Sequence, residues 1–388
     1  MISHTAANAA NSGPHRGAST LLLAAALLPA SLGLAACQSG PPSPTASVPD
    51  GQFQACLRYY RSLSLNRASG PTTIAQLNRI TGIVGCTNQG VASIEGAQYL
   101  TSADSLLLRM DQISDLTPLT GLTNLTGLDL GSNHISDITP LARLNNLTWI
   151  SLDGNQISDT TPLTGLTNLT ELGLGSNHIS DTTPLAGLTN LTSLNLSGNQ
   201  INDSGITPLA GLTNLTELDL ISNHISDTTP LAGLTNLTSL NLSGNQISDT
   251  TPLAGLTNLT SLNLSGNQIS DVSALAGLTD LTSLNLSGNQ ISDVSALAGL
   301  PAVKATTGHV DDLWCVLDDQ QLAATARTGP PQPLPNVAGL GTVSWQVTQG
   351  DAIVNNGAVT YRSAGTVALK FTDSGSTFSG TVTVTVIS

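Results

Sequence analysis

The sequence predicts a repeat solenoid followed by a small all-β domain. Between residues 100 and 300 almost the same 22-residue unit recurs, and after residue 305 the repeat gives way to short alternating runs. The 388-residue chain carries 25 acids, 11 bases, a formal charge of -14 and only 9% charged residues. This acidic balance argues against a protein that binds nucleic-acid backbones, because such a protein needs a basic face.

Residues 1–36 are predicted to be a signal peptide. Arg16 precedes an apolar stretch over residues 21–34 that leads into Ala35-Ala36-Cys37, which is the basic, apolar, small-residue order of a secretory signal. Together with Leu34, these residues resemble a bacterial lipobox. The resemblance implies cleavage before Cys37 and a lipid on its sulfur, with an outer-membrane or surface location in a cell with two membranes, since Gln38 is not the retention aspartate. An ordinary signal with a chance cysteine is the alternative.

The next segments are predicted to be a tether over residues 37–50 and an N-terminal cap over residues 51–92. The tether is Pro/Ser-rich and is expected to be extended. The cap should be helical and shield the first coil. Cys56 and Cys86 are the natural disulfide pair in an oxidising compartment, whereas Cys315 is expected to be a buried small hydrophobe rather than a reactive thiol.

Residues 93–305 are predicted to hold nine coils with the pattern L-x-x-L-x-L-x-x-N-x-I, which is the signature of leucine-rich repeats. The register follows one asparagine in steps of 22 residues, with a single step of 24. These ladder asparagines are Asn133, Asn155, Asn177, Asn199, Asn223, Asn245, Asn267 and Asn289, and Asp111 takes their place in a first, imperfect copy. One coil buries too little apolar surface to offset the ordering of its backbone, so each coil needs neighbours.

Two polar positions recur in every coil and are expected to be structural. The ladder asparagines should turn inward and satisfy backbone groups of adjacent coils. An aspartate four residues later recurs in all nine coils and should form an Asx turn or cap the turn opposite the strand, rather than bind calcium. The two extra residues of the long coil, within 202–206, are expected to form a loop bulge. The Asn-Leu-Thr glycosylation sequons are expected to follow from the repeat alone.

Residues 306–388 are predicted to form a C-terminal cap and a small antiparallel sandwich. Alternating runs occupy residues 343–347, 367–371 and 381–386, and Asn356-Gly357 is a hairpin signal. This pattern resembles a bacterial immunoglobulin-like domain, which implies a spacer or clamp after the repeats.

The candidate binding residues lie at the outward strand positions, which are six, four and two residues before each ladder asparagine. Coils two to six hold acids and large apolar residues there, whereas the last three coils repeat Ser-Asn-Ser. The predicted partner-binding residues are Asp129, Trp149, Asp153, Glu171, Glu217, Asp219 and Ile221. A tryptophan beside carboxylates has the composition of an interface anchor with a polar rim, and the acids would attract cationic partners. A harmless surface aromatic and a solvated acidic face are the alternatives.

No metal, cofactor or enzymatic activity is expected. His134, His178 and His224 lie two coils apart, which is about 10 Å at the strand spacing of a sheet and too far for one zinc ion. No nucleophile elbow, phosphate loop or zinc-protease motif appears in the sequence. The Trp314-Cys315 junction is the remaining place for an unsuspected site.

The repeats resemble those of the internalin family of bacterial surface proteins over roughly residues 70–305. The 22-residue period, the I-S-D-x-x-P-L segment and the opening I-E-G-A-Q-Y-L over residues 94–100 carry this resemblance. It implies a non-enzymatic surface protein that binds a host or neighbouring-cell protein through the concave face of the solenoid. The cysteine pair and the lipid anchor depart from the best-known internalins, so a specific target does not transfer. An ordered polar array that binds glycan, ice or mineral through the Ser-Asn-Ser rows is the alternative.

Overall fold

The computed structural model describes residues 44–64, 71–300, 314–316, 320–327, 332–333, 343–355, 358–373 and 379–387. The predicted signal peptide, the lipidation site Cys37 and the Asn356-Gly357 turn lie outside these residues. No helix in the described part has both the length and the apolar character needed to cross a bilayer.

The N-terminal cap combines helix α1 (Gly51–Ser64), helix α2 (Ile74–Leu77) and strand β1 (Gly82–Gly85). The predicted disulfide is confirmed, because Cys56 of α1 is bonded to Cys86 at the end of β1 with the Cα atoms 5.8 Å apart. The bond joins the helical part of the cap to the sheet of the solenoid.

Asp50 fastens the start of α1 to the chain that enters the first coil. Its Oδ1 accepts hydrogen bonds from the backbone N–H groups of Gln52 and Phe53, both at 2.9 Å. Its Oδ2 accepts from the N–H groups of Ala92 and Ser93 at 2.9 and 3.1 Å. Burial acts to raise the pKa of this carboxyl, but these N–H donors outweigh it and hold the pKa below its ordinary value.

The cap begins earlier than the sequence predicts, because residues 44–50 are packed onto it rather than extended as a tether. Ile74 donates its N–H to the carbonyl of Pro44 at 3.0 Å, and Thr45 forms a β-bridge with Thr73. Val48 is 7% exposed and packs where Gly96 leaves room, since a Cβ at Gly96 would lie 2.6 Å from the Val48 Cγ2. Proline and serine content alone does not reveal such docking.

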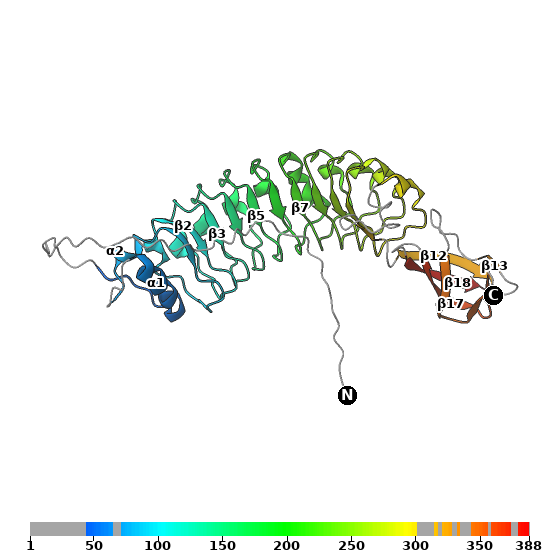
Figure 1. The fold of residues 1–388 in the computed structure, drawn as a ribbon, viewed down its shortest axis with the longest axis horizontal. Helices are drawn as coiled ribbons and strands as arrows, with labels where there is room; N and C mark the ends of the chain where they lie inside the picture. The colour runs from blue at the N-terminus through cyan, green and yellow to red at the C-terminus, as the bar shows by residue number, and fades with distance from the viewer. Residues whose placement is uncertain are drawn as a thin grey trace, which may run out of the picture. The chain divides into compact units, whose positions relative to one another are not determined.

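The solenoid is built on an 11-stranded parallel sheet in which strand order equals chain order (Figure 1). After β1 the strands are β2 (Ala103–Leu107), β3 (Gly127–Asp129), β4 (Trp149–Ser151), β5 (Glu171–Gly173), β6 (Ser193–Asn195), β7 (Glu217–Asp219), β8 (Ser239–Asn241), β9 (Ser261–Asn263), β10 (Ser283–Asn285) and β11 (Trp314–Val316). The nine predicted coils are confirmed as those of β2 to β10, and the sheet adds one strand at each end. Cys315 pairs in register with the inward Leu284, although its side chain lies outside the described residues.

Short 3-10 helices form the opposite side of the coils. They are η1 (Ala97–Tyr99), η2 (Thr117–Leu119), η3 (Thr139–Leu141), η4 (Thr161–Leu163), η5 (Thr183–Leu185), η6 (Thr207–Gly211), η7 (Thr229–Leu231), η8 (Thr251–Leu253), η9 (Ser273–Gly277) and η10 (Ser295–Gly299). In η2 to η8 the second residue is proline, whose fixed φ suits the start of a helix and whose missing N–H is not needed there.

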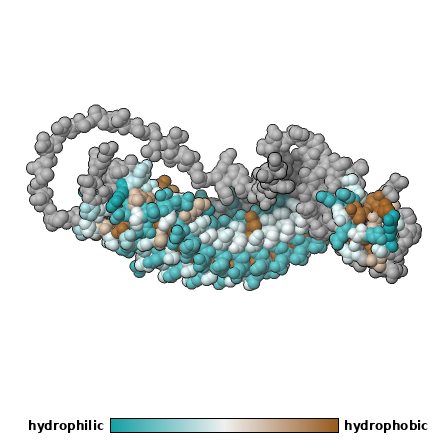
Figure 2. All heavy atoms as spheres, turned by 90° about the horizontal axis from the view of Figure 1, so that it is seen from below, coloured by the Kyte–Doolittle hydropathy of each residue, from teal (hydrophilic) through white to brown (hydrophobic). Residues whose placement is uncertain are grey.

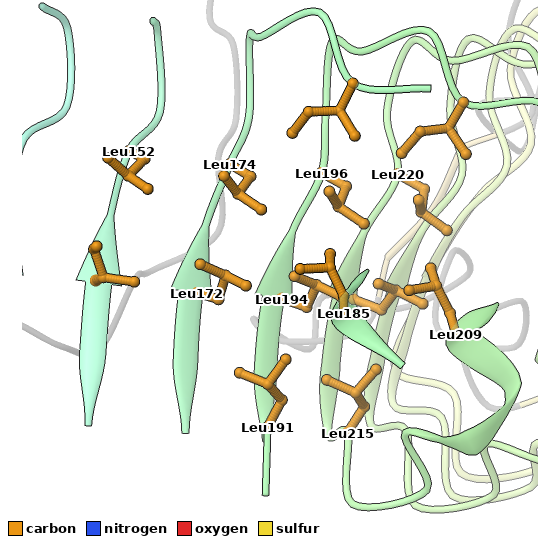
Figure 3. Close-up of a cluster of buried hydrophobic side chains, with 14 of the residues drawn as sticks. Leu152, Leu172, Leu174, Leu185, Leu191, Leu194, Leu196, Leu209, Leu215 and Leu220 are labelled. Carbon is orange, nitrogen blue, oxygen red and sulfur yellow. The ribbon is translucent and has the colours of Figure 1, made fainter. Parts of the chain in front are cut away.

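Leucines of successive coils stack into continuous columns between the sheet and the 3-10 helices. Figure 3 shows Leu152, Leu174, Leu196 and Leu220 side by side on neighbouring coils. All four are 0% exposed, as are most leucines of the repeats. Each leucine is covered by the coils on both sides, which is why no coil forms this core alone.

The ladder asparagines bind adjacent coils as predicted. Asn133 donates from Nδ2 to the carbonyl of Leu108 in the preceding coil at 2.8 Å and to that of Leu130 in its own coil at 2.9 Å. Its Oδ1 accepts from the N–H of Ile113 at 2.9 Å. The pattern recurs through Asn289, and the eight side chains are between 0 and 7% exposed. Each amide therefore satisfies backbone groups that the leucine core would otherwise leave buried without partners.

The repeated aspartates confirm the Asx-turn prediction in eight coils. In these, Oδ1 accepts from the N–H two residues later at 2.8 Å, as Asp115 does from Thr117. Hydrogen bonding to Thr117 also lowers the pKa of Asp115 below its ordinary value. This arrangement accounts for the row of carboxylates without a bound cation.

The long coil departs from the prediction of a loop bulge. Its extra residues form one turn of helix, α3 (Asp203–Ile206), which Asn202 caps by accepting from the N–H of Gly205 at 3.1 Å. Asp203 makes no Asx turn and accepts instead from the N–H of Ser226 at 2.6 Å and of Asp227 at 2.9 Å. The solenoid stays continuous, because the inserted turn bonds to the next coil.

The C-terminal region contains a four-stranded sheet in the order β12-β18-β17-β14 and a three-stranded sheet in the order β13-β16-β15. The strands are β12 (Gln320–Arg327), β13 (Gln332–Pro333), β14 (Val343–Gln349), β15 (Ala352–Asn355), β16 (Ala358–Tyr361), β17 (Gly365–Asp373) and β18 (Ser379–Ile387). The predicted hairpin is confirmed, because β15 and β16 pair antiparallel with Asn355 opposite Ala358. The pairing is not wholly antiparallel, since β12 joins β18 in parallel. The immunoglobulin-like character stays a prediction.

In the first coil the side chain at the ladder position keeps one buried oxygen without a hydrogen-bond partner. Asp111 stands in the ladder position, is 6% exposed, and accepts from the N–H groups of Gln89 and Val91 at 2.9 and 3.0 Å. Its Oδ2 has no hydrogen-bond partner among the described residues. In the other coils this place belongs to the Nδ2 group that donates to backbone carbonyls. Burial raises the pKa of the Asp111 carboxyl, although the N–H donors oppose the rise.

We expect Asp111→Asn to stabilise the protein, and the gain to depend on pH. The asparagine would donate to the carbonyls that a carboxylate repels, so we expect a gain of about 1–2 kcal/mol near pH 7. Because the pKa of Asp111 is raised in the folded protein, its carboxyl keeps a proton at pH values where the same carboxyl in the unfolded chain has lost it. The stability of the wild type therefore falls relative to the variant as the pH rises from the ordinary carboxyl pKa through the raised pKa. Thermal unfolding of both proteins across this range measures the gap, and a gap that does not shrink at acidic pH would contradict the assignment.

Two buried threonine hydroxyls provide a second prediction. Thr160 and Thr228 are each 1% exposed, and their Oγ1 atoms have no partner among the described residues. The equivalent positions in other coils include Ile138, Val272 and Val294.

We therefore expect Thr160→Val and Thr228→Val each to raise the free energy of unfolding by about 1 kcal/mol, because an unpaired hydroxyl leaves the core while the shape is kept. Thr182→Val is the matched control, since the Thr182 hydroxyl donates to the carbonyl of Gly205 at 2.6 Å and its loss should destabilise. Urea unfolding measures all three changes, and a loss of stability in the first two variants would refute the prediction.

Candidate interaction face

The outward side chains of β1 to β10, with the residue two positions after each strand, form one surface that we call the sheet face. In the three-residue strands β3 to β10 the central residue is buried, as Leu194 is, and its two neighbours point outward. The register aligns Gly127, Trp149 and Glu171 in the first outward row. The rows predicted from the repeat are therefore confirmed by the strand pairing.

Trp149 of β4 is partly buried because a glycine in the preceding strand, β3, makes room for it. The Nε1–Cε2–Cζ2 edge of the indole lies over the backbone of Gly127, where a Cβ atom would come within 2.3–2.4 Å of it. No described residue accepts a hydrogen bond from the indole. The ring is thus held against the sheet along one edge, with its remaining surface available to a partner.

Asp153 is bound into the fold more than the sequence suggests. Its Oδ1 accepts from the N–H of Gly175 at 2.7 Å and from Nδ2 of Asn195 at 3.0 Å, and its Oδ2 accepts from the Ser151 hydroxyl at 3.0 Å. A Cβ at Gly173 would lie 2.4 Å from its Oδ2. This carboxylate links three successive coils, so we assign it a positioning role on the sheet face.

Asp129 and Asp219 share a structural role with asparagines of the same row. Each accepts on Oδ1 from the N–H two residues later at 3.0 Å, as Asn195 and Asn263 also do. An Asx turn therefore closes the strand in either case. The difference is the second polar atom, which is a carboxylate oxygen in the acids and an NH2 group in the amides.

Glu171 is the most available acid of the predicted set. It is exposed and forms no hydrogen bond with any described residue. Glu217 is also exposed and accepts only a long bond from the Ser193 hydroxyl at 3.4 Å. Ile221 is partly buried beyond β7.

The seven predicted residues fall into two groups rather than one cluster. Asp129, Trp149, Asp153 and Glu171 lie on or beside β3 to β5, whereas Glu217, Asp219 and Ile221 lie on or beside β7. The row of β6, with Ser193 and Asn195, separates them. Trp149 and Glu217 stand three strands apart, which corresponds to about 14 Å.

Three residues near the cap also belong to the sheet face and were missed by sequence reasoning. Ile83 of β1 pairs in register with Ser105 and is 58% exposed. Leu107 aligns with Asp129, and the Arg109 guanidinium lies 3.0 Å from where a Cβ of Gly131 would be. Ile83 stands 22 residues before Ser105 (105 − 83), so the repeat period itself was the signal that could have found it.

The sequons are explained by two further ladders. In the triplet 146–148, Asn146 donates from Nδ2 to the carbonyl of Thr123 at 2.8 Å, and the Thr148 hydroxyl donates to the carbonyl of Thr126 at 3.0 Å. The same bonds recur along the solenoid. The asparagine and the threonine are thus both coil-to-coil contacts, as expected of a pattern that follows from the repeat.

No group of three metal-ligating side chains occurs among the described residues. The three repeat histidines, His134, His178 and His224, are exposed on separate coils. Figure 2 shows one side of the solenoid as mostly hydrophilic or neutral, with a few small hydrophobic patches. The sheet face therefore presents a few larger side chains set among small polar ones.

Comparisons with known proteins agree with this architecture. A model described as leucine-rich repeats in two copies matches residues 145–187, 167–211, 189–233, 213–255 and 257–299, and a second leucine-rich repeat model matches residues 121–138. No curated protein matches the chain.

Solved structures show the same likeness over a large share of the chain. An internalin (InlF) from Listeria monocytogenes is 36% identical over 70% of this chain and 84% of its own, with a TM-score of 0.58. Internalin C2 (InlC2) from the same species is 42% identical over 56% of this chain and 94% of its own, with a TM-score of 0.52. A leucine-rich repeat protein of Leptospira interrogans is 27% identical over 58% of this chain and 57% of its own, with a TM-score of 0.51. The identity and the coverage of InlF show that this chain belongs to the internalin family.

Proposed function

We propose that this protein is an exported, lipid-anchored cell-surface protein that binds another protein through its sheet face, for adhesion to a host or neighbouring cell. The observation that carries the proposal is Trp149, seated along one edge over Gly127 and flanked in register by the unpaired Glu171. A large amphipathic ring beside a charge on a solvated surface is typical of the centre of a protein interface. No catalytic role is part of the proposal.

The rigidity of the sheet supports a binding role. Each outward side chain sits on a strand whose backbone is bonded to both neighbouring coils, and Asp153 ties three of those coils together. A partner would therefore meet a surface that is already ordered, so little conformational entropy is lost on binding. Recognition then depends on which side chains each coil presents.

The expected location rests on two features of the N-terminal region. The sequence Leu34-Ala35-Ala36-Cys37 supports lipidation at Cys37. The Cys56–Cys86 disulfide supports an oxidising compartment outside the cytoplasm.

A second candidate is an ordered polar array over the last coils. Asn241, Asn263 and Asn285 each engage Oδ1 in an Asx turn, which leaves their Nδ2 groups as a row of donors about 4.8 Å apart. Such a row suits a glycan, ice or a mineral surface. Ligand capture that Asn263→Asp abolishes and Trp149→Ala leaves intact would favour this candidate over protein binding.

The protein-binding role is tested by combining Trp149→Ala, Glu171→Lys and Glu217→Lys. We expect the combined variant to lose capture of the partner in cross-linking on intact cells, because it removes the aromatic anchor and reverses two charges of the sheet face. Ala186→Lys, an exposed change beside the 3-10 helix η5, is the control and should capture normally. Undiminished capture by the combined variant would refute the role of the sheet face.

The anchor is tested by Cys37→Ser. We expect the variant to leave the membrane fraction and to appear in the medium or periplasm, because a lipid-modified cysteine is then absent. Incorporation of labelled palmitate, measured beside fractionation, should fall to background. Retention in the membrane without label incorporation in either protein would show that the anchor is of another kind.

A further inference from the structure

We infer that the cap-proximal part of the sheet face, on β1 to β5, docks an extended peptide segment of its partner that carries an apolar side chain toward one end and a lysine or arginine toward the other. This inference rests on the proposed binding function and names the partner chemistry and the part of the face that recognises it. The apolar end would lie on Ile83 and Leu107, and the basic end between Trp149 and Glu171.

The most exposed large apolar side chains lie at one end of the described solenoid. Three large hydrophobic side chains stand out among the described residues as highly exposed: Tyr59 at 61%, Ile83 at 58% and Met110 at 52%. All three belong to the cap or the first coil. Leu107 aligns with Asp129 in the second row, so apolar surface continues from Ile83 onto β2. From β8 onward the same rows hold only serine and asparagine.

Small residues occupy this end of the first row, so few side-chain atoms project from the sheet there. Between Ile83 and Trp149 the row holds Ser105, which is 7% exposed, and the buried Gly127. No long side chain therefore rises from this row between the two apolar residues. The Trp149 indole covers Gly127, so a partner backbone can approach the sheet closely over Ser105, while its side chains reach Ile83 on one side and the indole on the other.

The charges favour a basic group at the Trp149 end. Glu171 lies opposite Trp149 on β5 and has no partner among the described residues, and Asp129 lies on β3 in the adjacent outward row, opposite Ser151. A lysine or arginine there gains both the carboxylate and a cation–π contact with the indole. The chain itself carries 11 bases against 25 acids, so a second copy of it is a poor source of this group.

The span fits a short extended segment. Ile83 and Glu171 lie on β1 and β5, four strand spacings apart, which is about 19 Å. An extended chain advances about 3.3 Å per residue, so roughly six residues cover this distance. Apolar and basic positions about five residues apart are thus the pattern that the surface selects.

Selection from a random twelve-residue peptide library displayed on phage tests the inference with the purified protein. We expect enriched sequences with an aliphatic or aromatic residue and a lysine or arginine four to six positions apart. Synthetic copies should bind Trp149→Ala and Glu171→Lys at least tenfold more weakly than wild type. Ile83→Ser should weaken binding several-fold.

The control is Ala186→Lys, the exposed change beside η5 and outside the sheet face, which should bind the selected peptides within twofold of wild type. Failure to enrich any sequence, enrichment of acidic peptides, or equal loss with Glu171→Lys and Glu217→Lys would overturn the inference. Concentration-dependent dimers that Ile83→Ser abolishes would also overturn it, because the surface would then serve a second copy. If Glu217→Lys abolished partner capture on cells and Glu171→Lys left it intact, the proposed function would stand and this inference alone would be refuted.

Discussion

The structure depends on the way each coil completes the hydrogen bonds of the next. A coil of 22 residues turns sharply enough to leave backbone groups inside a leucine core, where an unpaired group is costly. The ladder asparagines solve this, because one amide serves two coils at once, as Asn133 does with Leu108, Leu130 and Ile113. The leucine columns supply the hydrophobic stabilisation, and the asparagines allow that core to be continuous.

The same register that stacks leucines inward also places the outward residues in rows. An outward residue can therefore be substituted without harm to the core, but its side chain still lies beside those of residues 22 positions away on either side. Gly127 is the clearest case, since its missing side chain is what lets the Trp149 indole rest on the sheet. Asp153 shows the converse, because a residue predicted to bind a partner is held by Ser151, Gly175 and Asn195. The binding face is thus partly made of the contacts that stabilise the solenoid.

The regular hydrogen bonding between coils changes at the first coil and at the one irregular coil inside the array. In the first coil Asp111 accepts as an asparagine would but leaves its Oδ2 unpaired, so the ladder position is less well satisfied at the junction between cap and solenoid than in the interior coils. There the disulfide and Asp50 add restraints that the interior coils do not need. Inside the array, α3 absorbs an irregular step because Asp203 bonds directly to the following coil. Stability and specificity are therefore distributed unevenly along one regular architecture.

The sequence by itself determined the coil count, the inward leucines and asparagines, the Asx turns and the outward rows, because each follows from the repeat period. It also determined the disulfide, because two cysteines flank one short segment. It could not show that Trp149 leans on Gly127 or that Asp153 spans three coils, since those contacts join side chains whose directions the period does not specify. It also placed the start of the cap too late, as residues 44–50 reveal their packing only through Thr45, Val48 and their distant partners. Ile83 joined the sheet face only when strand pairing extended the repeat into the cap. A repeat fixes which residues align between coils, but the tertiary structure decides which of the aligned residues touch, because contact depends on size and direction as well as on register.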